Sequence, residues 1–160
     1  FELMDFIGID VNYIATQSVF IGLNYNPRYR PSQIQKQMLD AGKLGRKSGE
    51  GFYAYHKGAL NPKPNKDKEL GQKIFDRILA MLINEAIEAL YMKIGSKKDI
   101  DLAMCIGVNY PQGLLKWADD WGLNNVLNQL VNLHETYRDD RYQPSILLRN
   151  KIKDKTIFYS

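Results

Sequence analysis

The hydrophobic positions of this chain recur at the spacing of an α-helix along most of its length. The clearest case runs from Glu69 to Ile94, where one continuous apolar stripe follows the period expected of a buried helix face. No useful length of the chain alternates apolar and polar residues with the two-residue period of a β-strand. The pattern therefore predicts an all-α protein, and its longest stripe consists of Phe75, Ile78, Leu79, Leu82, Ile83, Ala86 and Leu90.

Shorter helices are predicted on both sides of this stripe by residues that favour helix ends. Ser32 and Ser96 begin capping boxes, and Asp10, Asn124 and Ser145 stand where further helices are expected to start. Glycine-rich and proline-rich stretches separate the helical segments. The predicted helices follow Asp10, run from Ser32 to Gly42, Ser96 to Gly107, Leu114 to Trp121 and Asn124 to Tyr137, and continue from Ser145 to about Lys153.

Two segments of the chain resemble each other closely enough to indicate a duplicated module. Each has an Asp three residues before a Gly, and each continues to an Arg-Tyr-x-Pro-Ser sequence. From Gly8 to Tyr29 the separation is 21 positions, and from Gly122 to Tyr142 it is 20, so one deletion aligns the copies. The shared positions are Asp5, Gly8, Arg28 and Pro31 in the first copy and Asp119, Gly122, Arg141 and Pro144 in the second.

The repeated charged residues allow two interpretations each. Asp5 and Asp119 suit either a catalytic carboxylate or an acceptor for backbone N–H groups of a neighbouring loop, and we favour the second. Arg28 and Arg141 suit either anion binding or bracing of the chain before a capped helix, by bonds to carbonyls and stacking on the adjacent tyrosine. For these arginines, too, we favour the structural role.

Composition is that of an ordinary globular protein, with 44% apolar and 25% charged residues in 160. Cys105 is the single cysteine, which fits a reducing, cytoplasmic setting. No apolar run reaches the roughly 20 residues that a membrane helix needs. His56 and His134 lack metal-ligand spacing, so no metal site is predicted. Because the chain opens on Phe1-Glu2-Leu3-Met4-Asp5, as if inside a helix, we expect it to be part of a longer polypeptide.

The net charge of +4 is concentrated in one segment, from Lys43 to Lys73, which carries eight basic and three acidic residues. A solvated linker is the simpler interpretation, and contact with a polyanion is the alternative. Within it, residues 49–54 spell a G-x-G-x-x-A sequence. That fingerprint binds dinucleotides only between a strand and a helix, and here it follows a helix and precedes a proline–lysine stretch. We therefore predict no cofactor site in the chain.

Several longer sequences resemble the C-terminal domain of 3-hydroxyacyl-CoA dehydrogenases. Residues 106–119 match the family pattern with Tyr110, Pro111 and Gly113, and residues 1–5 match its second half. Residues 44–53 match the G-x-K-[ST]-G-x-G-F-Y segment through Gly49 and Gly51. The resemblance implies a helical domain of the 6-phosphogluconate-dehydrogenase-like type. We expect residues 1–56 to be the second half of a first module, 57–68 a linker, and 69–160 a complete second module.

The resemblance also implies an activity for the whole enzyme. The family oxidises L-3-hydroxyacyl-CoA to 3-ketoacyl-CoA with NAD, in fatty-acid or aromatic-acid breakdown. Its NAD site and catalytic His–Glu pair lie in an N-terminal domain that these residues do not include. At the family's catalytic Asn the sequence has Asp76, and an ionised Asp has no hydrogen to donate. We therefore expect no turnover from this chain alone.

Three functions remain to be compared. The first is the dehydrogenase region just described, with the N-terminal NAD-binding domain and acyl-CoA as partners and pairing as a homodimer or between modules of one chain. Candidate residues for the substrate cleft or a partner contact are Arg46, Lys47, Phe52 and Tyr53. The second is an assembly module without ligand contact. The third, a nucleic-acid binder, is disfavoured because no known nucleic-acid module surrounds the basic segment.

Overall fold

A computed structural model describes residues 1–159, and the regular secondary structure within them is helical, with no β-strand. Isolated bridges pair Glu50 with Gly45 and with Ala54. The all-α prediction is therefore confirmed. The helices are α1 (Glu2–Ile7), α2 (Ile9–Gly22), α3 (Gln33–Asp40), α4 (Lys68–Tyr91), α5 (Lys97–Gly107), α6 (Leu114–Trp121), α7 (Leu123–Tyr137) and α8 (Ile146–Lys153).

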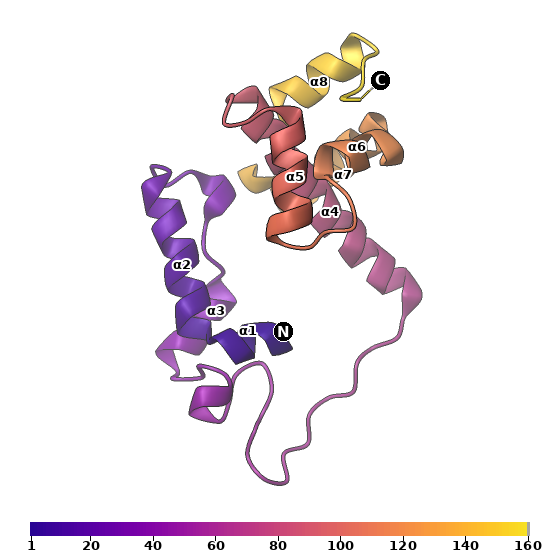
Figure 1. Ribbon diagram of the computed structural model, residues 1–160. Helices are drawn as coiled ribbons and strands as arrows, with labels where there is room; N and C mark the ends of the chain where they lie inside the picture. The colour runs from indigo at the N-terminus through magenta and orange to yellow at the C-terminus, as the bar shows by residue number, and fades with distance from the viewer. Residues whose placement is uncertain (160) are drawn as a thin grey trace. The chain divides into compact units, whose positions relative to one another are not determined.

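The chain forms two compact units (Figure 1), which we call unit 1 (Phe1–Asn65) and unit 2 (from Lys66 onward). Unit 1 contains α1 to α3, two short 3-10 turns at Pro27–Tyr29 and Arg46–Ser48, and the glycine-rich segment after them. Unit 2 contains α4 to α8 and a 3-10 turn at Asp140–Tyr142. Among the described helices, none is both long and apolar enough to cross a membrane.

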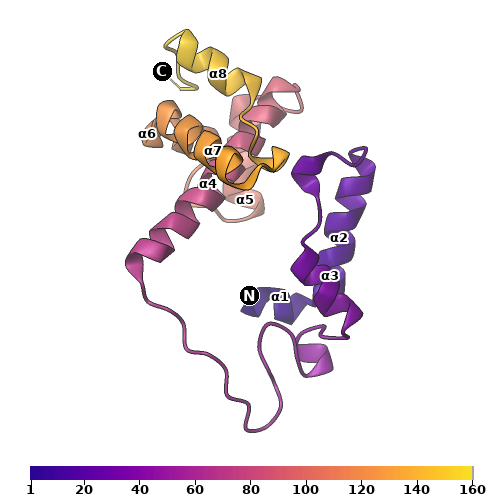
Figure 2. The same cartoon turned by 180° about the vertical axis from the view of Figure 1, so that it is seen from behind.

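Unit 2 is organised around α4. Asp67 caps this helix by accepting hydrogen bonds from the amides of Glu69 and Leu70 at 2.9 and 3.1 Å. Figures 1 and 2 show α5, α6 and α7 gathered about α4, and α8 also contacts it. The core contains Leu79, Ile83, Ile87, Leu115, Leu130 and Leu148. Of the predicted stripe, Leu79, Ile83 and Ala86 are buried, whereas Phe75 and Ile78 are 46% and 53% exposed.

The duplicated segments fold alike. The helix pair α1–α2 corresponds to α6–α7, the 3-10 turn at Pro27–Tyr29 to that at Asp140–Tyr142, and α3 to α8. Gly8 joins the first helix pair with φ 111° and ψ 132°, and Gly122 joins the second with φ 91° and ψ 124°. Such positive φ values strain any residue with a Cβ, so glycine lets one helix turn into the next without a linker.

This glycine turn corrects a prediction about helix starts. Asp10 and Asn124 do not cap α2 and α7, because these helices begin at Ile9 and Leu123 with the glycines in the N-cap position. Ser32 does cap α3, accepting a bond from Gln35 N at 3.5 Å. The hydroxyl of Ser145 caps nothing at the start of α8, and among the described residues it has no hydrogen-bond partner.

The two units differ greatly in how much apolar surface they bury. In the described part of unit 1, Ile9 is the one buried apolar residue, whereas unit 2 buries a whole cluster. Phe1 is 72% exposed and its counterpart Leu115 is 0% exposed, because α4 packs against α6 in unit 2. The described part of unit 1 contains no counterpart of α4, so its matching face lacks that cover.

Candidate functional site

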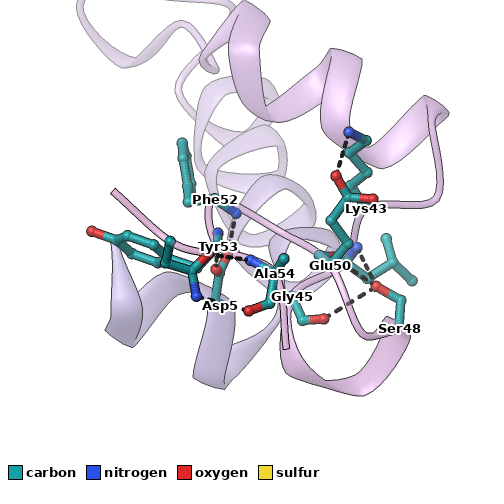
Figure 3. Close-up of polar contacts among 10 residues, drawn as sticks. Asp5, Lys43, Gly45, Ser48, Glu50, Phe52, Tyr53 and Ala54 are labelled. Carbon is teal, nitrogen blue, oxygen red and sulfur yellow. Dashed lines mark hydrogen bonds and ion pairs between the residues drawn. The ribbon is translucent and has the colours of Figure 1, made fainter. Parts of the chain in front are cut away.

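The carboxylate of Asp5 holds the glycine-rich segment of unit 1 against α1. Its oxygens accept hydrogen bonds from the amides of Phe52 and Tyr53 and from the hydroxyl of Tyr55, each at 2.9 Å. Figure 3 shows the two amides directed at this one carboxylate. Asp5 is 1% exposed, so these charge-assisted bonds replace the water that the carboxylate gives up. We call this arrangement a carboxylate clip.

Unit 2 repeats the carboxylate clip at Asp119. Its oxygens accept bonds from Phe158 N at 2.9 and 3.1 Å and from Tyr159 N at 2.8 Å. Each clip therefore holds the amides of a Phe-Tyr pair that lies far along the chain from the aspartate. The repeated aspartates thus take the position of backbone acceptors rather than that of groups facing a cleft.

Further contacts secure the end of the unit 2 clip. The Tyr159 hydroxyl donates to the carbonyl of Lys97 at 2.9 Å, and Lys97 Nζ donates to the carbonyl of Phe158 at 2.6 Å. Burial, followed by hydrogen bonding to Asp101, raises the pKa of Tyr159 to about 12. In unit 1, burial and the bond to Asp5 likewise raise the pKa of Tyr55. Both hydroxyls are therefore held in their neutral, donating form.

Close packing explains the glycines of unit 1. A Cβ on Gly45 would collide with the backbone of Asp5, and one on Gly51 would collide with its carboxylate. Gly49 has free space around it, but its φ of 81° disfavours other residues. Unit 2 has Ile157 before its Phe-Tyr pair and only five positions from Lys153 to Phe158, against twelve from Asp40 to Phe52. The carboxylate clip therefore does not itself require the glycine-rich loop.

The basic residues of this loop point to different neighbours. The guanidinium of Arg46 lies between the rings of Phe6 and Tyr55, at 5.4 and 5.5 Å from their centroids. Lys47 pairs with Asp10 at 2.5 Å, and this bond lowers the pKa of Asp10.

The four residues predicted for the substrate cleft or a partner contact therefore do not lie in one site. Arg46 and Tyr53 share the lining of a small hollow of about 180 Å³. Lys47 is directed to α2, and Phe52 packs on Phe1 at 4.5 Å between centroids. The dinucleotide fingerprint at residues 49–54 meets no strand or helix, and the amides of Phe52 and Tyr53 are already bonded to Asp5. This segment therefore lacks the strand–turn–helix setting of a dinucleotide site.

Asp76 lies on α4 beside a second hollow. It accepts a bond from Gln72 Nε2 at 2.7 Å and lines about 230 Å³ of space with Phe75, Trp117 and Trp121. Tyr110 and Pro111 line an adjoining apolar hollow of about 220 Å³. No group of three or more His, Cys, Asp or Glu side chains in the described chain is placed to hold a metal ion.

Two polar residues that sequence analysis assigned no role organise unit 2. Asp101, 9% exposed, accepts bonds from the amides of Leu115 and Lys116 at 2.8 and 3.0 Å and so caps α6. A Cβ on Gly113 would collide with this carboxylate, which explains that glycine. Asn84 is fully buried and joins α4 to the approach to α8, donating to Gln143 O at 2.9 Å and accepting from Ser145 N at 2.8 Å.

Arg141 was expected to bond to carbonyls and to stack on Tyr142, but the structure shows a different set of contacts. Its Nε donates to Asp139 Oδ2 at 2.9 Å. Arg77 of α4, rather than Arg141, lies over the Tyr142 ring, 5.2 Å from its centroid. Arg28 lies in the corresponding 3-10 turn of unit 1, where its amide donates to Asn26 Oδ1 at 3.1 Å. Pro31 and Pro144 each directly precede the serine before α3 and α8.

Comparison with known proteins gives a consistent result. The family model described as 3-hydroxyacyl-CoA dehydrogenase, C-terminal domain, matches residues 1–55 and 74–157. The chain is 27% identical to 3-hydroxyadipyl-CoA dehydrogenase of Escherichia coli (strain K12), over 94% of this chain and 50% of that protein. It is 30% identical to the fatty acid oxidation complex subunit alpha of Shewanella amazonensis, over 98% of this chain and 24% of that protein.

A solved structure shares the fold. The crystal structure of 3-hydroxybutyryl-CoA dehydrogenase from Escherichia coli K12 matches with a TM-score of 0.76 and 26% identity, over 94% of this chain and 50% of that one. The chain thus spans about half the length of that relative and about a quarter of the fatty acid oxidation subunit.

The carboxylate clip of unit 2 is tested by Asp119→Asn. The amide side chain loses the negative charge and one of its two acceptor oxygens, so we expect unfolding of unit 2 to become easier by about 1–3 kcal/mol. Asp120→Asn is the matched control, since Asp120 is exposed and forms an ion pair with Lys116 one helical turn away. Equal stability of the two variants in denaturant titrations would refute the role assigned to Asp119.

Proposed function

Because the chain belongs to the family of the 3-hydroxyacyl-CoA dehydrogenase C-terminal domain, we propose that it is the C-terminal region of an NAD-dependent L-3-hydroxyacyl-CoA dehydrogenase. The whole enzyme would oxidise 3-hydroxyacyl-CoA to 3-ketoacyl-CoA in the breakdown of fatty or aromatic acids. The observation that carries this proposal is the family match over both copies of the repeat, in residues 1–55 and 74–157.

Within that enzyme the region has a supporting role. It provides a helical wall of the acyl-CoA cleft and a surface for pairing, either in a homodimer or between the two modules of one chain. Residues 1–56 are half of a first module, 57–68 a linker and 69–160 a second module. NAD and the catalytic His–Glu pair belong to an N-terminal domain of that enzyme, which is consistent with the greater length of the relatives that the chain matches.

The second module is proposed to have kept its packing and lost its chemistry. Asp76 replaces the family's Asn and already accepts a bond from Gln72. A carboxylate accepts hydrogen bonds and has none to donate, so it does not reproduce the function of an amide NH₂ group. The loop before the Phe-Tyr pair is also shorter in unit 2, while the carboxylate clip is retained.

A purely structural assembly module, without ligand contact, is the alternative. It is favoured by the partners that Lys47 and Phe52 already have in unit 1. Arg46 favours the cleft role instead. Its guanidinium is exposed beside the Phe6 and Tyr55 rings, where a phosphate or carbonyl of an acyl-CoA would reach it.

The chain alone should not catalyse the reaction. Pure chain mixed with 3-hydroxybutyryl-CoA and NAD is expected to form no NADH, because the NAD site and the catalytic His–Glu pair are proposed to lie in the N-terminal domain. The longer enzyme that contains this region serves as the positive control in the same absorbance assay. Steady NADH formation by the isolated chain would contradict the proposed division of labour.

Arg46→Gln in the longer enzyme separates the cleft role from the assembly role. Loss of a charge-assisted contact to acyl-CoA should raise KM by about tenfold with kcat little changed. Lys43→Gln is the control, because Lys43 lies on the same loop and pairs with Glu50 at 2.6 Å. An unchanged KM for Arg46→Gln would support the assembly module and exclude contact at this residue.

A further inference from the structure

Unit 1 contains a hollow of about 330 Å³ between α2 and the start of α3, which the proposed function does not use. Its aromatic lining comes from Tyr13 and Phe20 of α2 and from Tyr25 just after that helix. The Phe20 and Tyr25 rings meet edge to face, with centroids 5.4 Å apart. Tyr13 and Phe20 are half-buried, so the aromatic wall is partly fixed by packing.

The backbone beside this wall is strained. Asn24 and Tyr25 both have positive φ, at 54° and 60°, a conformation that residues other than glycine rarely adopt. Here unit 1 has one residue more than unit 2, where Arg138 alone has a positive φ at the corresponding helix end. The amide of Tyr25 donates to Phe20 O at 2.8 Å and holds the turn. Strain of this kind gathers at binding sites, and here it places the Tyr25 ring on Phe20.

The opposite side of the hollow is positively charged. Arg30 is exposed there, and no carboxylate of the described chain forms an ion pair with it. Lys36 also lines the hollow, and Asp40 pairs with it at 2.5 Å. The first turn of α3, after Ser32, faces the same space through Gln33 and adds the positive end of a helix dipole. Because Asp40 neutralises the charge of Lys36, the net positive charge on this side of the hollow comes from Arg30.

The shared fold does not demand this combination. Unit 2 has Leu127 where unit 1 has Tyr13, His134 where it has Phe20, and Gln143 where it has Arg30. The same helices therefore form with an aliphatic residue, an imidazole and an amide in these places. The packing of these helices therefore does not require the aromatic rings of Tyr13 and Phe20 or the charge of Arg30.

We propose that this hollow binds an aromatic ring that carries an anionic group. The ring packs against Phe20 and Tyr25, and a phosphate or carboxylate meets the in-plane N–H donors of Arg30 at the start of α3. A volume of about 330 Å³ falls within the range of small-molecule pockets, roughly 300–1,000 Å³. Mononucleotides and aryl carboxylates both present this chemistry.

Titration of the full chain with phenyl phosphate, followed by amide chemical shifts, tests the site. We expect saturable binding with a Kd below about 1 mM and shifts confined to residues 13–36, which include the lining of the hollow. Adenosine 5′-monophosphate and phenylacetate, titrated separately, distinguish the nucleotide from the aryl carboxylate as the preferred source. Inorganic phosphate, which lacks a ring, should bind about tenfold more weakly.

Two variants and a control locate the binding. Arg30→Gln introduces the residue that unit 2 has at this position, and Tyr25→Asn removes the ring with a residue that tolerates positive φ. Each should weaken phenyl phosphate binding about tenfold. Arg149→Gln, an exposed charge of α8, should leave it unchanged. Absence of saturation, equal binding of inorganic phosphate, or equal effects of Arg30→Gln and Arg149→Gln would overturn the proposal.

Discussion

A carboxylate on a short helix must find hydrogen-bond donors once the chain around it is folded, and both units meet this requirement in the same way. Asp5 and Asp119 each accept the amides of a Phe-Tyr pair that follows the third helix of the repeat. Asp5 is buried and Asp119 half-buried, and a fully buried carboxylate without partners would cost several kcal/mol. The need for these donors therefore fixes the Phe-Tyr pair of each copy beside its aspartate. In unit 1, Gly45 and Gly51 lie so close to Asp5 that a Cβ at either position would collide with it.

The rest of unit 2 depends on two further polar residues within an apolar core. Asn84 ties the central helix to the approach to α8, and Asp101 begins α6. Both are buried with their oxygens bonded, so removal of either partner would leave a desolvated group. Unit 1 shares the carboxylate clip and the glycine turn but buries little apolar surface, because its described part has no helix in the place of α4. The two copies therefore share the carboxylate clip and the glycine turn, but they do not share the buried apolar packing.

Helix content and the duplication were predictable from the sequence, because apolar periodicity and the paired Asp–Gly and Arg-Tyr-x-Pro-Ser positions are local signals. The roles of Asn84 and Asp101 were not, since their partners lie 59 and 14 residues away and no spacing rule connects them. Arg141 shows the same limit, because its charge pairs with Asp139 while Arg77, from another helix, takes the stacking position on Tyr142. The helix starts at Gly8 and Gly122 were missed because Asp10 and Asn124 offered a more familiar capping signal.

Hydrogen exchange on the unmodified chain tests the carboxylate clip most directly. The amides of Phe52, Tyr53, Phe158 and Tyr159 lie outside helices, so a peptide without the clip would exchange them as fast as the linker around Lys63. Our account predicts that all four exchange much more slowly than the linker amides, because each donates to a carboxylate. Exchange of either Phe-Tyr pair at the rate of the linker would contradict it.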